Sequence, residues 1–273
     1  MGSSPKWGTY TFMGVRLRIV LTLVAVGTCS DSASGTLPRA LLPDIDQRPP
    51  LAVSVRWGQA PNEHRQWLVF TSSVENVGFG PLLVQGRRPN RKVATMRADQ
   101  LIELRDGGFE RIPRVGRMRY NVNPSHSHWH LKPFEQYELR TLAGRQITRD
   151  HKSGFCLTSD HQSPLPTLGP RGTPVDKSDC RKNEPGALRV FEGMAVGWGD
   201  IYIPAKEGQY VDITNVAPGT YDLVHRVNVG RLLRETNYAN DSASLRIRLL
   251  PASSPTDLPG VVVLKSCETG IHC

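Results

Sequence analysis

The stretch His126-Ser127-His128-Trp129-His130 has the residue types and the spacing of a metal site. In an extended strand alternate side chains share one face, so histidines at i, i+2 and i+4 would bring three imidazoles together. Imidazole is the commonest transition-metal ligand in proteins. The spacing therefore predicts a metal site, and the alternatives are a chance cluster on a solvated edge strand or a structural zinc site.

The kind of metal follows only in part from this triplet. Three neutral imidazoles with no thiolate or carboxylate nearby in the sequence suit Cu(II), Zn(II) or Fe(II). They leave coordination positions open for water, O2 or a substrate, which is the arrangement of a site for chemistry. Trp129 is expected to pack beneath the ligands and support their orientation.

The composition indicates a globular, turn-rich protein. The chain has 273 residues, of which 38% are hydrophobic and 22% are charged, with 25 Gly and 21 Pro. This length fits one large domain, and an all-β domain can use most of it. The formal net charge of +9 favours anionic partners. Because the sequence has no recognisable nucleic-acid motif, we interpret the charge as a surface feature and expect no nucleic-acid partner.

Short strand signals recur along the chain, separated by turn residues such as Asp106-Gly107-Gly108 and Pro218-Gly219. Residues 66–78 and 221–250 resemble the strands and turns of immunoglobulin-like adhesion sandwiches. No long helical periodicity and no repeat of fixed period is visible. We therefore expect an all-β, immunoglobulin-like β-sandwich with long loops that carry the three-histidine site. The expected strands are 51–57, 66–74, 80–84, 101–104, 118–122, 134–139, 209–213, 221–229, 243–250 and 261–264.

The N-terminal region has the features of an export signal. Residues 13–26 combine an arginine-bearing start with a short apolar core, too short for a confident membrane span. Met13 fits a signal start better than Met1, so residues 1–12 are interpreted as an extension. Gly27-Thr28-Cys29 loosely resembles a lipoprotein cleavage site, although Thr28 is a poor residue before the cysteine. We expect a secreted or cell-envelope protein that reaches a membrane only if Cys29 is lipidated.

This signal sets the expected domain boundaries. Residues 1–30 would hold the extension and the signal, 31–50 a linker, 51–250 the main domain and 251–273 a C-terminal tail.

The cysteines also favour an oxidising compartment. Setting Cys29 aside leaves four, which are consistent with bridges Cys156–Cys180 and Cys267–Cys273, although four cysteines permit three pairings. None has CxxC spacing, which excludes a zinc ribbon or a thioredoxin motif. Residues 160–185 are rich in Pro, Gly and Ser, and we expect a disulfide-tethered flap near the site, with a disordered insert as the alternative.

Five motifs occur in an order that resembles the catalytic domain of the lysyl oxidase family. Any one of them would be weak, whereas five in the family's order are specific. The resemblance spans residues 41–249 and is weakest before Pro124. The motifs are His126-x-His128-x-His130, His151-Lys152-x-x-Phe155-Cys156-Leu157, the run from Gly193 through Asp200 to Tyr202, Tyr210-Val211-Asp212-Ile213-Thr214-x-Val216-x-Pro218-Gly219, and Glu235-Thr236-Asn237-Tyr238-x-Asn240.

The resemblance implies a specific chemistry. His126, His128 and His130 would hold copper, and Lys152 and Tyr202 would be oxidised and joined into lysine tyrosylquinone, a cofactor made from the protein itself. The family's activity implies an oxidoreductase acting on CH–NH2 groups with O2 as acceptor. Its substrate would be a primary amine, either peptidyl lysine of extracellular proteins or a small alkylamine, converted to an aldehyde with release of ammonia and hydrogen peroxide.

The residues also suggest how protons would move. Burial and the charge of copper would lower the pKa of Lys152 and give the neutral amine that addition to a ring requires. For the catalytic base we favour Asp200, because it shares a face with Tyr202 if that segment is extended. Asp212 is the second choice, and the alternative for Asp200 is a turn-closing role after Gly199.

Three other residues carry weaker expectations. His225 alternates with apolar residues on one face of the expected strand, so we interpret it as a satisfied core histidine. Tyr137 is interpreted as a core tyrosine. His151 would either tune the neighbouring Lys152 or be exposed.

Two further functions fit the histidines. One is an exported, non-catalytic metal-binding β-sandwich that serves as an envelope or adhesion module. The other is a zinc hydrolase, disfavoured because no Glu or Asp lies within the triplet to activate water. The presence of both Lys152 and Tyr202 favours the oxidase, because neither residue is needed to bind metal.

Overall fold

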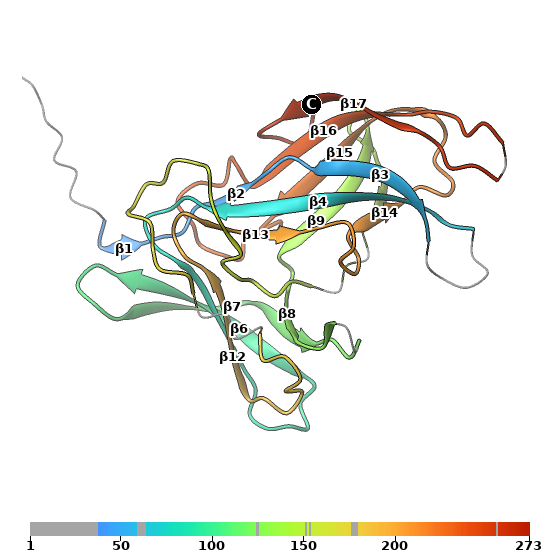
Figure 1. The fold of residues 1–273 in the computed structure, drawn as a ribbon. Coiled ribbons are helices and arrows are strands. Elements are labelled where there is room, and N and C mark those ends of the chain that lie inside the picture. The colour runs from blue at the N-terminus through green and yellow to red at the C-terminus, as the bar shows by residue number, and fades with distance from the viewer. Residues whose placement is uncertain are drawn as a thin grey trace, which may run out of the picture. The chain divides into compact units, whose positions relative to one another are not determined.

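The computed structural model describes residues 38–273 apart from 59–63, 124–125, 151, 153, 176–179 and 255. The expected signal, Cys29 and His151 therefore lie outside the described residues. Within the described ranges the structure is all-β, as the sequence predicted, and every strand pairing is antiparallel (Figure 1). Among these same residues, no helix is long and apolar enough to cross a bilayer.

Two of the sheets pack face to face as a sandwich. Phe70 from one sheet meets Tyr137 of the other edge-on, with ring centroids 4.8 Å apart, and lies 4.6 Å from the ring of His225. All three side chains are fully buried, so this contact lies in the core. In Figure 1, strands β3 and β4 run alongside β15 and β16.

The first sheet of the sandwich has the order β10-β9-β15-β16-β17, and in the second β4 pairs with β2, β3, β13 and β14 while β11 pairs with β13. The strands are β2 (Ile45–Gln47), β3 (Leu51–Trp57), β4 (Gln66–Asn76), β9 (Glu135–Thr141), β10 (Gln146–Arg149), β11 (His161–Gln162), β13 (Trp198–Tyr202), β14 (Tyr210–Asp212), β15 (Gly219–Val227), β16 (Ser242–Leu249) and β17 (Val261–Cys267).

The third sheet has the order β12-β5-β6-β7-β8, with β1 added beside β6. One face of this sheet is apolar, because Met96, Met118 and Leu131 are directly opposed across three strands and are fully buried. The strands are β1 (Ala40–Leu41), β5 (Leu82–Arg87), β6 (Thr95–Leu104), β7 (Phe109–Tyr120), β8 (Trp129–Lys132) and β12 (Arg189–Met194).

The ends of the domain differ from the expected boundaries. Strands β1 and β2 lie in the segment expected to be a linker, and β17 lies in the expected tail, yet each pairs with a strand of a main sheet. The Ile45 amide donates to the Glu235 carboxylate at 2.8 Å, which gives the early segment a buried partner. Both expected disulfides are present, Cys156–Cys180 and Cys267–Cys273.

Candidate metal and amine site

The structure brings the three histidines of the triplet together, but not on one extended strand. Only His130 lies in a strand, β8. The His126 amide donates to the Asn123 carbonyl at 2.8 Å, and the His128 amide donates to the His126 carbonyl at 3.1 Å, an i to i+2 bond typical of a γ-turn. The expectation of a continuous strand is therefore wrong, and a turn aims the first two rings toward the third.

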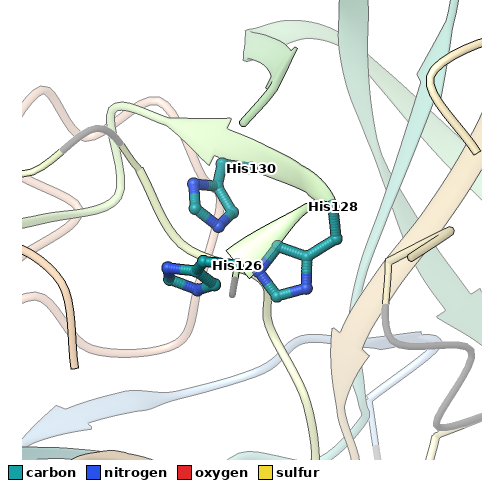
Figure 2. Close-up of side chains that lie close together, drawn as sticks. All are labelled: His126, His128 and His130. Carbon is teal, nitrogen blue, oxygen red and sulfur yellow. The ribbon is translucent and has the colours of Figure 1, made fainter. Parts of the chain in front are cut away.

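The three rings form a nearly equilateral group (Figure 2). Their centroids are 4.5, 4.7 and 4.8 Å apart, and one nitrogen from each lies within 4.8 Å of the others. Burial, together with the neighbouring His128 and His126, lowers the pKa of His130 to about 2. Neutral imidazole is the form that binds metal. The donor set thus fits a copper or zinc ion.

A carboxylate that the sequence analysis did not anticipate lies beside this triad. The Oε2 atom of Glu207 is 3.4 Å from Nδ1 of His126 and also accepts from the side-chain amides of Asn121 and Asn123 at 3.1 and 3.2 Å. Burial lowers the pKa of His126, and Glu207 opposes this shift. Glu207 therefore orients the ring of His126, although it lies far from His126 in the sequence.

The opposite side of the histidine stretch is fixed by the disulfide loop. Trp129 is fully buried, and its indole N–H donates to the Glu184 carbonyl at 3.1 Å. Its amide donates to the Cys180 carbonyl at 3.0 Å, and the Asn183 amide donates to the Ser127 carbonyl at 2.8 Å. The described part of the loop is thus tethered against the stretch, as expected for a flap.

The structure places the Lys152 amine over the ring of Tyr202. The Nζ atom is 3.9 Å from the ring centroid of Tyr202 and 4.4 Å from that of Phe155. It donates a hydrogen bond to Gln209 Oε1 at 2.9 Å, which holds it there. Burial lowers the pKa of Lys152 to about 8, although the carboxylates of Glu135 and Asp200 oppose the shift. Lys152 and Tyr202, the two expected precursors of the quinone, are therefore in contact.

Asp200 and Tyr202 share one face of β13, because that segment is extended. The Tyr202 hydroxyl lies 2.9 Å from Asp200 Oδ2 and 2.8 Å from the Cys156 carbonyl oxygen, and it can donate to either. Asp200 is only 1% exposed, and burial raises the pKa of both groups. A buried carboxyl with a raised pKa beside the phenol suits proton transfer.

Asp212, the second choice for the base, has a different environment. It lies on β14 and accepts hydrogen bonds from Arg65 at 2.9 Å and from the Thr214 amide at 2.9 Å. Although burial raises the pKa of Asp212, the hydrogen bonds from Thr214 and Arg65 lower it overall. These contacts make Asp212 a structural acceptor.

A buried polar network beneath Lys152 was missed by the sequence analysis. The Tyr137 hydroxyl lies 3.0 Å from Glu135 Oε2 and 3.1 Å from Gln209 Oε1, and the Ser72 hydroxyl donates to the other Glu135 oxygen. Burial raises the pKa of Glu135 to about 7, while Ser72 and the charge of Lys152 oppose the shift. Tyr137 is therefore a core residue with a polar role. The sequence signal for this network was the spacing of Glu135 and Tyr137, which are two residues apart and therefore share one face of a strand.

Two glycines allow these groups to approach one another. At Gly154 an added Cβ would lie 2.8 Å from the Cβ of His130, so only glycine lets the chain after Lys152 pass the histidine. At Gly208, where φ is +73°, an added Cβ would lie 3.1 Å from the Cα of Lys152. Since Glu207 contacts His126 and Gln209 contacts Lys152, residues 207–209 link the triad to the amine.

His225 lies in the core, as predicted, but it is not satisfied in the expected way. It packs between the rings of Phe70 and Tyr137, and burial lowers its pKa well below the usual value. Neither ring nitrogen has a hydrogen-bond partner among the described residues.

The comparisons with known proteins agree with this geometry. Residues 90–254, more than half of the chain, match the family model described as lysyl oxidase. The chain belongs to the lysyl oxidase family. The matched range contains the triad, Lys152, Asp200 and Tyr202. Ser72, which supports Glu135 from β4, lies outside it.

Individual lysyl oxidase homologs match with modest identity. Lysyl oxidase homolog 2 of Xenopus laevis is 30% identical over 137 residues, which are 50% of this chain and 16% of that protein. Lysyl oxidase homolog 3 of Homo sapiens is 26% identical over 230 residues, 78% of this chain and 25% of that protein. The chain therefore spans a quarter or less of the length of these relatives.

Proposed function

We propose that this chain is a secreted, copper-dependent amine oxidase that converts primary amines to aldehydes. Copper would be held by His126, His128 and His130, and lysine tyrosylquinone would form from Lys152 and Tyr202. The observation that carries the proposal is the 3.9 Å between the Lys152 amine and the Tyr202 ring centroid. Neither residue is required for metal binding, so their contact beside a metal site favours the oxidase over a non-catalytic metal-binding module.

The overall reaction moves two electrons from the carbon that bears nitrogen to O2. One primary amine, one O2 and one water give one aldehyde, one ammonia and one hydrogen peroxide. When bound, copper would supply O2-dependent oxidation of the phenol, and the quinone would supply the electron sink for the amine. The substrate would be peptidyl lysine or a small alkylamine.

The chain's own residues would position the reacting groups and move protons. Gln209 holds the Lys152 amine over the ring, and the lowered pKa of Lys152 increases the fraction of neutral amine near neutral pH. Asp200 would accept a proton from the carbon beside the substrate nitrogen, and its burial and its hydrogen bond to the phenol support this role. The charge of Glu135 opposes the loss of the Lys152 proton.

A cavity leads to the amine from the outer surface. It has a volume of about 550 Å³, and its lining includes Lys132, Pro133, Glu135, Lys152, Gly154 and Val229. A pocket of this size admits an amine side chain.

Export is supported by the two disulfides, which form in oxidising compartments.

The test is peroxide release from a small alkylamine by protein produced with copper under air. Lys152→Met and Tyr202→Phe are expected to abolish release while the copper content stays near that of the wild type. Lys265→Met and Tyr221→Phe, outside the site, serve as matched controls and should retain activity. Copper binding without peroxide release by the wild type would overturn the oxidase and support the metal-binding module. Cleavage of a hydrolysable test substrate that requires zinc and releases no peroxide would support the hydrolase.

A further inference from the structure

A row of cations crosses the whole third sheet. In the register of the strands, one basic residue is directly opposite the next from β12 through β5, β6 and β7 to β8. The strands β12, β6, β7 and β8 lie together in the lower part of Figure 1. We refer to these five residues as the cation row: Arg189, Arg87, Arg97, Arg117 and Lys132.

This arrangement is unfavourable for the protein alone. Like charges directly opposite each other across strands destabilise a sheet. Asp99 offsets part of the charge, since its carboxylate lies 3.0 Å from Arg87 and 3.6 Å from Arg97. Arg117 and its exposed neighbour Arg119 have no carboxylate oxygen within 4.0 Å in the part of the chain that the structure describes. Their charge is therefore available to a ligand.

Four of the five residues of the cation row, all except Arg189, line a groove of about 1050 Å³. The described residues that line it include no acidic and no aromatic side chain. Guanidinium groups bind carboxylates in a bidentate geometry. Single-stranded nucleic acids are usually held by base stacking on aromatic rings, so the lining favours a carboxylate-rich ligand over such a strand. The cationic side chains of the lining are Arg87, Arg88, Arg97, Arg114, Arg117, Arg119 and Lys132.

The groove is continuous with the amine site. Lys132 and Pro133 line both the groove and the cavity that contains Lys152. Across β7 and β8, Arg119 is directly opposite His130, and Arg117 is directly opposite Lys132. A ligand that fills the groove therefore ends at the mouth of the cavity that admits the substrate amine.

We propose that the cation row docks an acidic peptide segment that flanks the lysine to be oxidised. The inference rests on the proposed function and names its substrate class. Five strands about 4.8 Å apart span roughly 19 Å, which an extended peptide covers with about six residues. Acidic residues within about six positions of the reactive lysine would occupy the groove.

The test compares two synthetic peptides of equal length, one with a lysine beside six Asp and Glu residues and one with Asn and Gln in their place. The acidic peptide is expected to show a kcat/KM about tenfold higher in peroxide release at low salt. This advantage should shrink as salt is added, because exposed charges are screened. Arg117→Gln combined with Arg119→Gln should remove most of it and leave oxidation of a small alkylamine unchanged.

A matched variant controls for net charge. Arg145→Gln with Arg248→Gln removes two exposed cations outside the groove, and it should keep the preference for the acidic peptide. Equal rates for both peptides, with the alkylamine still oxidised, would overturn the docking groove and leave the oxidase intact.

Binding without turnover separates the two proposals. Fluorescence anisotropy of a lysine-free acidic peptide should show binding to the wild type and loss of binding in the Arg117→Gln, Arg119→Gln variant. This holds even if no amine is oxidised, in which case the proposed function fails alone. Tighter binding of a single-stranded oligonucleotide, lost in the same variant, would overturn the acidic peptide as occupant.

Discussion

Two regions of this molecule gather charge in opposite ways. Around Lys152, charges of both signs are buried and hydrogen-bonded, with Glu135 and Asp200 stabilising the amine. Along the cation row, charges of one sign lie at the surface, with Asp99 as a shared partner for Arg87 and Arg97. The first arrangement fixes positions and shifts pKa values. The second keeps charge available for a partner and makes its effects depend on salt.

The energetic consequences also differ in sign. Removing one member of a buried charge pair leaves the other uncompensated, which is strongly destabilising. Removing one cation from a row of like charges relieves repulsion and should stabilise the sheet slightly.

Asp200→Asn should have the largest effect, on activity. Without the carboxylate that would accept the substrate proton, kcat for a small alkylamine should fall by about 10²–10⁴-fold. Asp212→Asn, which removes a carboxylate bonded to Arg65 and Thr214, is the matched control and should change kcat little. Peptide mapping should first confirm that the cross-link is present in both variants. Equal kcat values for the two variants would remove Asp200 from the mechanism.

Glu135→Gln should lower the free energy of unfolding at pH 7 by about 1 kcal/mol, because Lys152 loses a buried, half-ionised carboxylate that stabilises its charge. The matched change is Glu110→Gln, which removes an exposed partner of Arg234 and should cost less than about 0.5 kcal/mol. Urea denaturation measures both. A smaller loss for Glu135→Gln than for Glu110→Gln would show that burial does not strengthen the Lys152–Glu135 pair.

The rate of cross-link formation should rise with pH through about 8, because the folded-state pKa of Lys152 is lowered from 10.5 to about 8 and the neutral amine is the nucleophile. Glu135 raises the pKa of Lys152. In Glu135→Gln the rise should therefore move to lower pH. The measurement is the fraction of cross-linked peptide at fixed times after copper addition. A shift to higher pH would contradict the assigned direction of the charge effect.

The smallest effect is expected in the cation row. Arg117→Gln should stabilise the protein by about 0.3 kcal/mol at low salt, because Arg97 and Lys132 are directly opposite it. The gain should vanish at high salt. Arg248→Gln is the control, with no expected gain. A loss of stability at low salt would show that Arg117 already has an attractive partner.

The parts of the fold set by local pattern could be predicted from the sequence. Strand β3 has the predicted bounds, and both disulfides join the predicted cysteines. Strand β13 was not among the strand signals, since Gly197, Gly199 and Asp200 interrupt its apolar pattern, and pairing with β4 stabilises it.

The parts of the site set by tertiary pairing could not be predicted. Nothing near His126 in the sequence indicates that Glu207 contacts it, or that Gln209 holds Lys152. The cation row depends on the register of five strands. One of them, β12, pairs with β5 although the two are far apart in the sequence, so the row is visible only in the folded chain. The spacing of the histidines predicted the candidate metal ligands, whereas the residues that contact the site are visible only in the folded structure.

The most direct test of the central claim is peptide mapping of the full chain produced with and without copper under air. Our account predicts one covalent peptide that joins Lys152 to Tyr202 and reacts with a hydrazine, present with copper and absent without it. Two separate, unmodified peptides after copper loading would contradict the account.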